Sequence, residues 1–230
     1  MVIRLRDCYR VTIEHTDHNK HRSDVTPGQL RRGAIRNPYK PRIFGAGFTG
    51  VGIHAATSCG RDTRPYTAWV RMLERAYSPE KQKTNKSYIG CTVATEWHNF
   101  QNFAEWYASQ PFSGQGFQVD KDILLPGNKI YCAEFCRLVP ARINKILLDN
   151  PDRRGAHPVG VTFYAGKYVS HLSRDGRRYH LGRFATSEEA FKAYKAARED
   201  YIISSAERDR DSLPLEIYEA LMRHKISIND

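Results

Sequence analysis

The spacing of apolar side chains predicts two amphipathic helices in the middle of the chain. In the segment YTAWVRMLERAY, residues 66–77, apolar side chains recur at helical spacing, and charged side chains occupy the opposite face. The segment HNFQNFAEWYASQ, residues 98–110, shows the same pattern, and Asn99 is of a residue type that caps helix N-termini. We expect the aromatic side chains of residues 97–107 to form a core rather than a surface for stacking bases.

A different pattern, with period two, dominates residues 160–184. The segments GVTFY, KYVSHLS and RRYHLGRF each alternate as strands do, and RDGR places an Asp-Gly turn between the second and third. The following TSEEAFKAYKAARED begins with Thr186 and Ser187 as caps and places Ala190, Ala193, Tyr194 and Ala197 on one helical face. The pattern predicts a three-stranded sheet that packs on one helix.

Two further segments predict smaller elements. The first 60 residues contain short β-branched segments, such as YRVTIEH, separated by turn-forming residues, and they predict a small β-rich region. After residue 202, the segment LPLEIYEALMRHKISI predicts a short helix that opens at Pro214 and packs against a domain.

Residues 117–150 read as two strands followed by a helix. FQVDKDILL has strand character, PGNK is typical of a turn, IYCAEFCRLV continues in extended form, and PARINKILLDN begins with Pro140 near a helix start. Asp120 and Asn144 carry hard oxygen ligands of the kind that Mg²⁺ or Mn²⁺ binds. Such a ββα unit can hold one divalent cation between its first strand and its helix.

Net charge indicates the kind of partner that the chain binds, and cysteine usage indicates the cellular compartment. The chain of 230 residues carries a formal net charge of +11, concentrated in residues 1–66 and 151–201, which favours a polyanionic partner such as nucleic acid. Its five cysteines form no C-x-x-C pair, and the sequence shows neither a signal peptide nor an apolar run that could span a bilayer. We therefore expect a reduced, cytoplasmic protein, in the host cytoplasm if the gene is phage-borne, without a membrane partner.

The ββα segment resembles the HNH (His-Asn-His) endonucleases, in particular a group common in phage and homing-type genes. VDKDI stands where that family has Asp-His, GNK occupies the loop, CRLVP the second strand, and Asn144 the helical ligand position. The upstream segments within residues 66–107 also resemble the part that precedes the unit in these proteins, so the resemblance covers about residues 66–148. The resemblance implies a metal-dependent catalytic site made of Asp120, Lys121 and Asn144, with Asp120 and Asn144 as the metal ligands.

Lys121 departs from this family pattern because the histidine at its position is the general base. A lysine with an ordinary pKa near 10.4 is protonated at neutral pH and does not accept the proton of the attacking water. Lys121 could instead act as a cation on the scissile phosphate, with the base supplied by hydroxide, His98 or His54. An inactive scaffold remains the alternative.

The segment 160–202 closely resembles the APETALA/ethylene-response-factor type of DNA-binding domain. The family's pattern appears as Gly160-Val161, Lys167-Tyr168, Leu181-Gly182-Arg183-Phe184, Thr186 to Ala190 and Ala193-Tyr194. In that family an exposed sheet face lies in the major groove of double-stranded DNA. The resemblance therefore implies these DNA-binding candidates: Lys167, Tyr168, His171, Arg174, Arg177, Arg178 and Arg183.

Together these patterns predict an α+β protein with three parts. They are a β-rich basic N-terminal region (1–60), an HNH-like ββα-metal domain with flanking helices (61–150), and an APETALA-type three-stranded sheet plus helix with a helical tail (151–230). The predicted function is that of a phage-type HNH endonuclease, a homing-endonuclease-like hydrolase that binds double-stranded DNA and nicks one strand per chain with Mg²⁺ or Mn²⁺. The alternative is a catalytically inactive DNA-binding protein on a degenerate HNH scaffold, acting as a regulator or a counter-defence factor.

Overall fold

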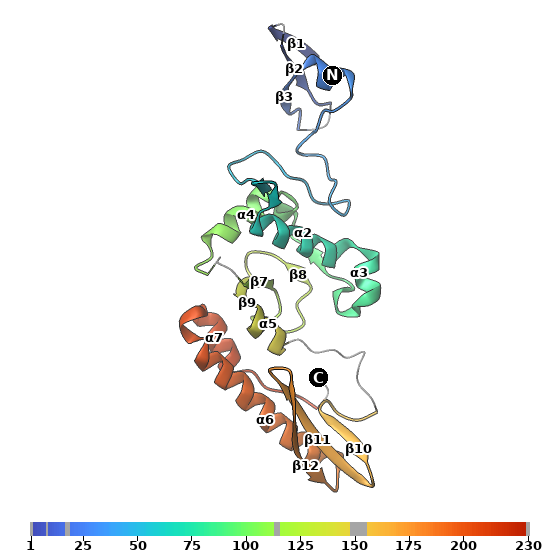
Figure 1. Ribbon diagram of the computed structural model, residues 1–230, viewed down its shortest axis with the longest axis vertical. Coiled ribbons are helices and arrows are strands. Elements are labelled where there is room, and N and C mark those ends of the chain that lie inside the picture. The colour runs from blue at the N-terminus through green and yellow to red at the C-terminus, as the bar shows by residue number, and fades with distance from the viewer. Residues whose placement is uncertain (1, 8, 17–18, 113–115, 148–155, 229–230) are drawn as a thin grey trace. The chain divides into compact units, whose positions relative to one another are not determined.

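The computed structural model is a mixed α+β structure, 40% helical and 24% strand, in agreement with the predicted class. It describes residues 2–7, 9–16, 19–112, 116–147 and 156–228, with side chains from Tyr9 onward. Contacts divide the chain into two compact units. Unit 1 comprises Met1–Ser109 and Lys129–Glu134, and unit 2 comprises Gln110–Asn128 and Phe135–Asp230 (Figure 1).

Unit 1 begins with the β-rich region that the first residues predict. It contains β1 (Val2–Asp7), β2 (Arg10–Glu14), β3 (Arg22–Val25) and α1 (Pro27–Arg31). The three strands form one antiparallel sheet in sequence order. Val11, Ile13 and Val25 make its small core, because alternate residues of β2 turn to the same face.

The rest of unit 1 contains the two predicted helices and several short elements. These are β4 (Thr57–Ser58), β5 (Arg61–Asp62), α2 (Arg64–Tyr77), α3 (Pro79–Thr84), η1 (Lys86–Tyr88), β6 (Thr92–Val93), η2 (Thr95–His98), α4 (Phe100–Ser109) and β8 (Ile130–Tyr131). Asn99 caps α4, since its Oδ1 accepts a hydrogen bond from the Gln101 amide at 3.1 Å. The aromatic residues expected in a core are buried: Trp97, Phe100, Phe103 and Tyr107.

Residues before position 60 also contribute to these helices. The amide of Phe48 donates to the His98 carbonyl, and the Phe100 amide donates to the Phe48 carbonyl, both at 2.9 Å. A Cβ added to Gly47 would come within 2.3 Å of the Leu73 side chain, so only glycine allows this close approach. This part of the chain thus packs with α2 and α4, across the boundary expected at residue 60.

Unit 2 contains the ββα segment and the late module. Its elements are β7 (Phe117–Asp120), β9 (Arg137–Pro140), α5 (Ala141–Leu147), β10 (Val161–Tyr164), β11 (Lys167–Arg174), β12 (Arg177–Phe184), α6 (Ser187–Arg208), η4 (Arg210–Ser212) and α7 (Leu215–Met222). Strands β10, β11 and β12 form the predicted antiparallel sheet. Asp175 and Gly176 make the turn with φ of 51° and 79°, and Thr186 forms a capping box with Glu189.

One hydrophobic core joins the ββα helix, the late module and the tail. Its buried residues come from β9 and α5 (Val139, Ile143, Ile146), the sheet (Val161, Leu172), α6 (Ala190, Phe191, Tyr194, Tyr201, Ile202, Ala206) and the tail (Leu213, Ile217, Leu221). The tail therefore packs against a domain, as predicted. The contacts set no boundary at residue 150, because α5 and α6 bury their apolar faces in the same core.

The strand pairing of the ββα segment differs from the simple hairpin that its sequence predicts. β7 pairs antiparallel with β9, whereas β8 pairs in parallel with β6. The pairing of β8 is fixed by hydrogen bonds from the Thr92 amide to the Lys129 carbonyl at 2.8 Å and from the Ala94 amide to the Tyr131 carbonyl at 2.9 Å. The PGNK turn thus lies inside a longer connection between β7 and β9.

Among the described residues, none of the helices combines the length and the apolar character needed to cross a bilayer.

Candidate functional site

The loop after β7 is closed by two side chains that bind each other's backbone. Lys121 is 6% exposed, and its Nζ donates to the Asn128 carbonyl at 2.5 Å and to both carboxylate oxygens of Asp122 at 2.7 and 2.8 Å. In return, Asn128 Nδ2 donates to the Lys121 carbonyl at 2.9 Å. Asn128 occupies the loop position at which the HNH family pattern has an asparagine that shapes the turn.

Asp120, at the end of β7, holds the start of the same loop. Its Oδ1 accepts hydrogen bonds from the backbone amides of Asp122 and Ile123, both at 2.8 Å. Burial raises the pKa of the Asp120 carboxyl, and the two amide hydrogen bonds oppose this rise because they favour the charged form.

Asn144 lies on α5 and is buried at 7% exposure, and its Nδ2 donates to Gln118 Oε1 at 3.0 Å. Gln118 and Asp120 share one face of β7, since side chains alternate along a strand and Val119 between them is buried. The helix thus contacts the strand face that carries Asp120. The two predicted ligands lie on elements that pack together, although 24 positions separate them in sequence.

The donor set at this place suits Mg²⁺ chemically. Asp120 and Asn144 offer a carboxylate and an amide oxygen, and Mg²⁺ commonly binds one or two protein oxygens and keeps several waters. A richer cluster is absent from the described residues, where no group of three or more His, Cys, Asp or Glu side chains could hold a metal. Asp120 and Asn144 stay the predicted ligands of such an ion.

Lys121 stands directly after Asp120, at the position where the HNH family pattern has its general base. Lys121 donates hydrogen bonds to Asp122 and to the Asn128 carbonyl, so the structure places it as a donor that closes the loop. The alternative bases His54 and His98 belong to unit 1, where His54 Nε2 lies 2.8 Å from Glu105 and His98 Nε2 lies 2.9 Å from the Tyr77 hydroxyl. Burial lowers the pKa of His98.

The second predicted site is the face of β10–β12 that turns away from α6. Tyr168 and Leu172 of β11 contact the core under α6, so Lys167, Val169, His171 and Ser173 turn to the opposite face. Residues directly opposite on neighbouring strands share a face. Arg183 lies opposite Val169, His180 opposite His171, and Arg178 opposite Ser173.

A β-bulge at Leu181 sets this arrangement on β12. The register shifts there, because Ser170 pairs with Gly182 whereas His171 pairs with His180. The bulge brings Arg183 and His180, three positions apart, to the same face. The rings of His171 and His180 confirm the shared face, since their centroids lie 5.5 Å apart.

The structure thus separates the predicted DNA-binding residues into two groups. Lys167, His171, Arg178 and Arg183 gather on the face away from α6, together with His180, which the sequence reading missed because it did not include the bulge. We call these five residues the basic sheet face. Tyr168, Arg174 and Arg177 turn to the α6 side, where the Arg174 guanidinium lies 4.9 Å from the centroid of the Tyr201 ring.

The electrostatics of the basic sheet face are those of a cationic surface. Burial, together with the neighbouring Arg178 and His180, lowers the pKa of His171. The positive side chains of this face repel one another, and a bound anion reduces the free-energy cost of that repulsion. The face is therefore chemically suited to phosphate.

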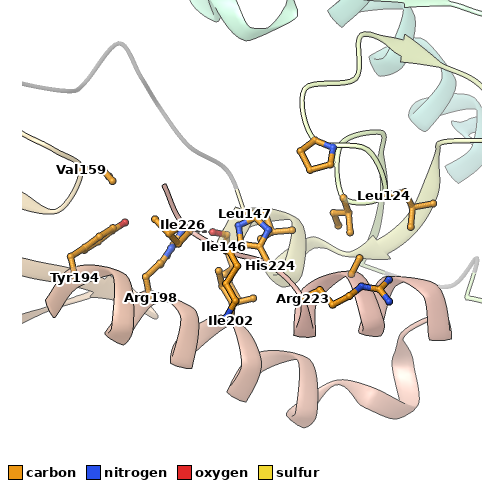
Figure 2. A pocket seen from close by; sticks show the side chains of 14 residues that line it. Leu124, Ile146, Leu147, Val159, Tyr194, Arg198, Ile202, Arg223, His224 and Ile226 are labelled. Carbon is orange, nitrogen blue, oxygen red and sulfur yellow. Dashed lines mark hydrogen bonds between the residues drawn. The ribbon is translucent and has the colours of Figure 1, made fainter. Parts of the chain in front are cut away.

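A pocket of about 540 Å³ lies between the ββα segment, α6 and the residues after α7. Figure 2 shows Leu124 of the loop, Leu147 of α5 and Ile202 of α6 around it, with Arg198 and His224 among the polar lining residues. Arg198 donates to the Ile146 carbonyl and so ties α6 to α5 (Figure 2). The loop that contains Lys121 is thereby part of the same folded unit as the basic sheet face.

The HNH and APETALA resemblances rest on the motifs of the chain itself. Comparison of the chain with family models, with curated proteins and with solved structures found no match.

Proposed function

We propose that the protein binds double-stranded DNA through the basic sheet face. The observation that carries the proposal is the gathering of Lys167, Arg178 and Arg183 with His171 and His180 on one side of a twisted antiparallel sheet. A two-stranded or three-stranded ribbon fits the major groove of B-DNA, about 12 Å wide. Its outward cations then meet phosphates and base edges, while α6 supports the sheet from behind.

Two adjacent arginines provide the test. Arg178 belongs to the basic sheet face and Arg177 does not, yet both are exposed and both lie next to the same turn. We expect Arg178→Ala to weaken duplex binding and to lower the log–log salt slope by about one if it contacts a phosphate. Arg177→Ala removes the same charge and should change the affinity much less. Equal effects of the two changes in gel-shift titrations across salt would contradict the proposal.

Metal-dependent cleavage of that DNA is the second candidate function. It is favoured by the arrangement of β7, β9 and α5. Asn144 of α5 donates a hydrogen bond to Gln118, which lies on the same face of β7 as Asp120. A bound Mg²⁺ would supply polarisation of the scissile phosphate and stabilisation of the departing oxygen. The chain's own contribution would be to hold the ion with Asp120 and Asn144 and to keep the loop closed through Lys121.

Supercoiled plasmid distinguishes the two functions. If the ββα unit is catalytic, the full chain nicks the plasmid with Mg²⁺ or Mn²⁺ and stops when a chelator is added. Asp120→Ala should then abolish nicking and leave the gel-shift affinity nearly intact, because one carboxylate contributes little to an interface of many phosphate contacts. Binding without metal-dependent nicking would leave DNA binding as the function.

A further inference from the structure

A second basic surface, which shares His171 and Arg178 with the basic sheet face, lies at the edge of the sheet formed by β10. It is a cleft of about 1200 Å³ bordered by α5, the end of β11 and α6. The volume exceeds the range of about 300–1,000 Å³ that is typical of small-molecule pockets. We call it the edge cleft. Its size suits a segment of a polymer rather than a small molecule.

The cleft arises because β10 is shorter than its neighbour. β10 pairs with residues 167–170 of β11, and the Gly160 carbonyl then accepts the His171 amide at 2.8 Å. Beyond that point the structure shows no strand, within the described residues, that pairs with this side of β11. The groove therefore runs from Phe163 past the end of β10 toward the turn at Asp175.

The charges that line the edge cleft are almost all positive. Arg142 and Lys145 come from α5, Arg198 from α6 and Arg178 from β12. Two of these cations also bind the protein itself, because Arg142 pairs with Asp209 and Arg198 donates to the Ile146 carbonyl. The acidic residue among the lining residues is Asp175, and it is already engaged, since its carboxylate accepts the Tyr201 hydroxyl at 2.9 Å and lies 3.7 Å from Arg174. Such a lining attracts an anionic chain.

One end of the edge cleft is aromatic. Phe163 lines it and is 53% exposed, and its ring centroid lies 4.9 Å from that of Tyr168 and 6.2 Å from that of His157, which also lines the cleft. Tyr168 and His157 meet edge to face at 5.4 Å. This cluster holds the Phe163 ring in place and leaves more than half of its side-chain surface open. An ordered and exposed ring is a platform on which a base can stack.

We propose that the edge cleft binds a single-stranded nucleic acid, with phosphates on the basic side chains and a base stacked on Phe163. A positive groove with aromatic platforms is the arrangement that binds single strands, because each unpaired base exposes a π-face. In a duplex the bases are stacked on each other and cannot reach Phe163. The proposal does not depend on duplex binding by the basic sheet face.

The test compares two neighbouring aromatic residues in the full chain. Phe163 and Tyr164 are both exposed, but only Phe163 lines the edge cleft. With a fluorescein-labelled thymidine oligonucleotide of about 16 nucleotides, we expect Phe163→Ala to weaken binding by about 5- to 150-fold in anisotropy titrations. Phe163→Tyr should retain binding because the ring remains, and Tyr164→Ala should bind like the unchanged chain. A uridine RNA oligonucleotide of equal length distinguishes DNA from RNA.

Lysines provide a second, independent measurement. Lys145→Ala should lower the salt slope for the single strand by about 0.7, the value for one phosphate contact on single strands. Lys192→Ala, an exposed lysine of α6 that is not among the lining residues, should leave it unchanged. If Phe163→Ala bound the oligonucleotide like the unchanged chain, or weakened a duplex to the same degree, the proposal would be overturned. Arg183 does not line the edge cleft. If Arg183→Ala lost duplex binding and kept single-strand binding, that result would concern the basic sheet face and not the edge cleft.

Discussion

Lys121 and Asn128 each donate a hydrogen bond to the other's backbone carbonyl, and both side chains are buried. This exchange closes the loop between them and joins it to the end of β7. In the HNH family pattern, the position of Lys121 carries the catalytic base. In this chain Lys121 holds the loop closed through its hydrogen bond to the Asn128 carbonyl, so a substitution there affects stability as well as chemistry.

Lys121→Met should destabilise unit 2. The change preserves the length of the side chain but leaves the Asn128 carbonyl without this donor, which costs about 2 kcal/mol for a hydrogen bond to a charged group. The ion pair adds less, because Asp122 is half exposed and solvent screens it. Urea unfolding followed by far-UV circular dichroism measures the loss. Lys192→Met, on the exposed side of α6, is the matched control and should unfold as the unchanged chain does.

Lys121→His tests the catalytic hypothesis from the opposite direction. It introduces the imidazole that the family uses as a base, and a positioned base contributes about 10²- to 10⁴-fold to the rate. We expect metal-dependent plasmid nicking to increase, at the cost of part of the loop's stability. Adding Asp120→Ala to this variant should remove the gain. If both the unchanged chain and Lys121→His fail to nick with Mg²⁺ and with Mn²⁺, the ββα unit is a scaffold.

Duplex affinity should increase as the pH falls below about 6.5, the ordinary pKa of histidine. In the free protein, burial and the neighbours Arg178 and His180 hold the pKa of His171 below that value. A phosphate at the basic sheet face raises it again, so binding takes up a proton and strengthens as the pH falls from the bound pKa to the free one. His171→Gln should reduce this dependence. His54→Gln, a histidine of unit 1 that lies against Glu105, should not.

The late module should not be stable when it is expressed without α5 and without the tail. A fragment of residues 156–202 loses the contacts of Val139, Ile143, Ile146, Leu213, Ile217 and Leu221 with its core. Each buried aliphatic side chain contributes about 1.5–3 kcal/mol, so the loss is comparable with the whole stability of a small domain. We expect residues 110–230 to unfold cooperatively on heating and residues 156–202 to show no cooperative transition. Equal melting of the two fragments would mean that the shared core contributes little.

Elements with local sequence signals were predicted correctly. The helical spacing of residues 66–77, the Asp-Gly turn at residues 175–176 and the cap at Thr186 were each predicted and each confirmed, since a few neighbouring residues decide them. The residue types of Asp120 and Asn144 could also be singled out in this way. The structure adds that Asp120 and Asn144 lie on elements that pack together. β7 pairs with β9, and Asn144 donates a hydrogen bond to Gln118 of β7.

Which of these elements lie together depends on contacts between distant parts of the chain. The alternation of β12 alone places Arg177 and Arg183 on one face, whereas the bulge at Leu181 separates them, because one extra residue reverses every later side chain. The pairing of β8 with β6 and the common core of α5 and α6 depend on apolar surfaces that meet far apart in sequence. These features depend on burial between segments that are far apart in the sequence, so a short stretch of sequence does not predict them.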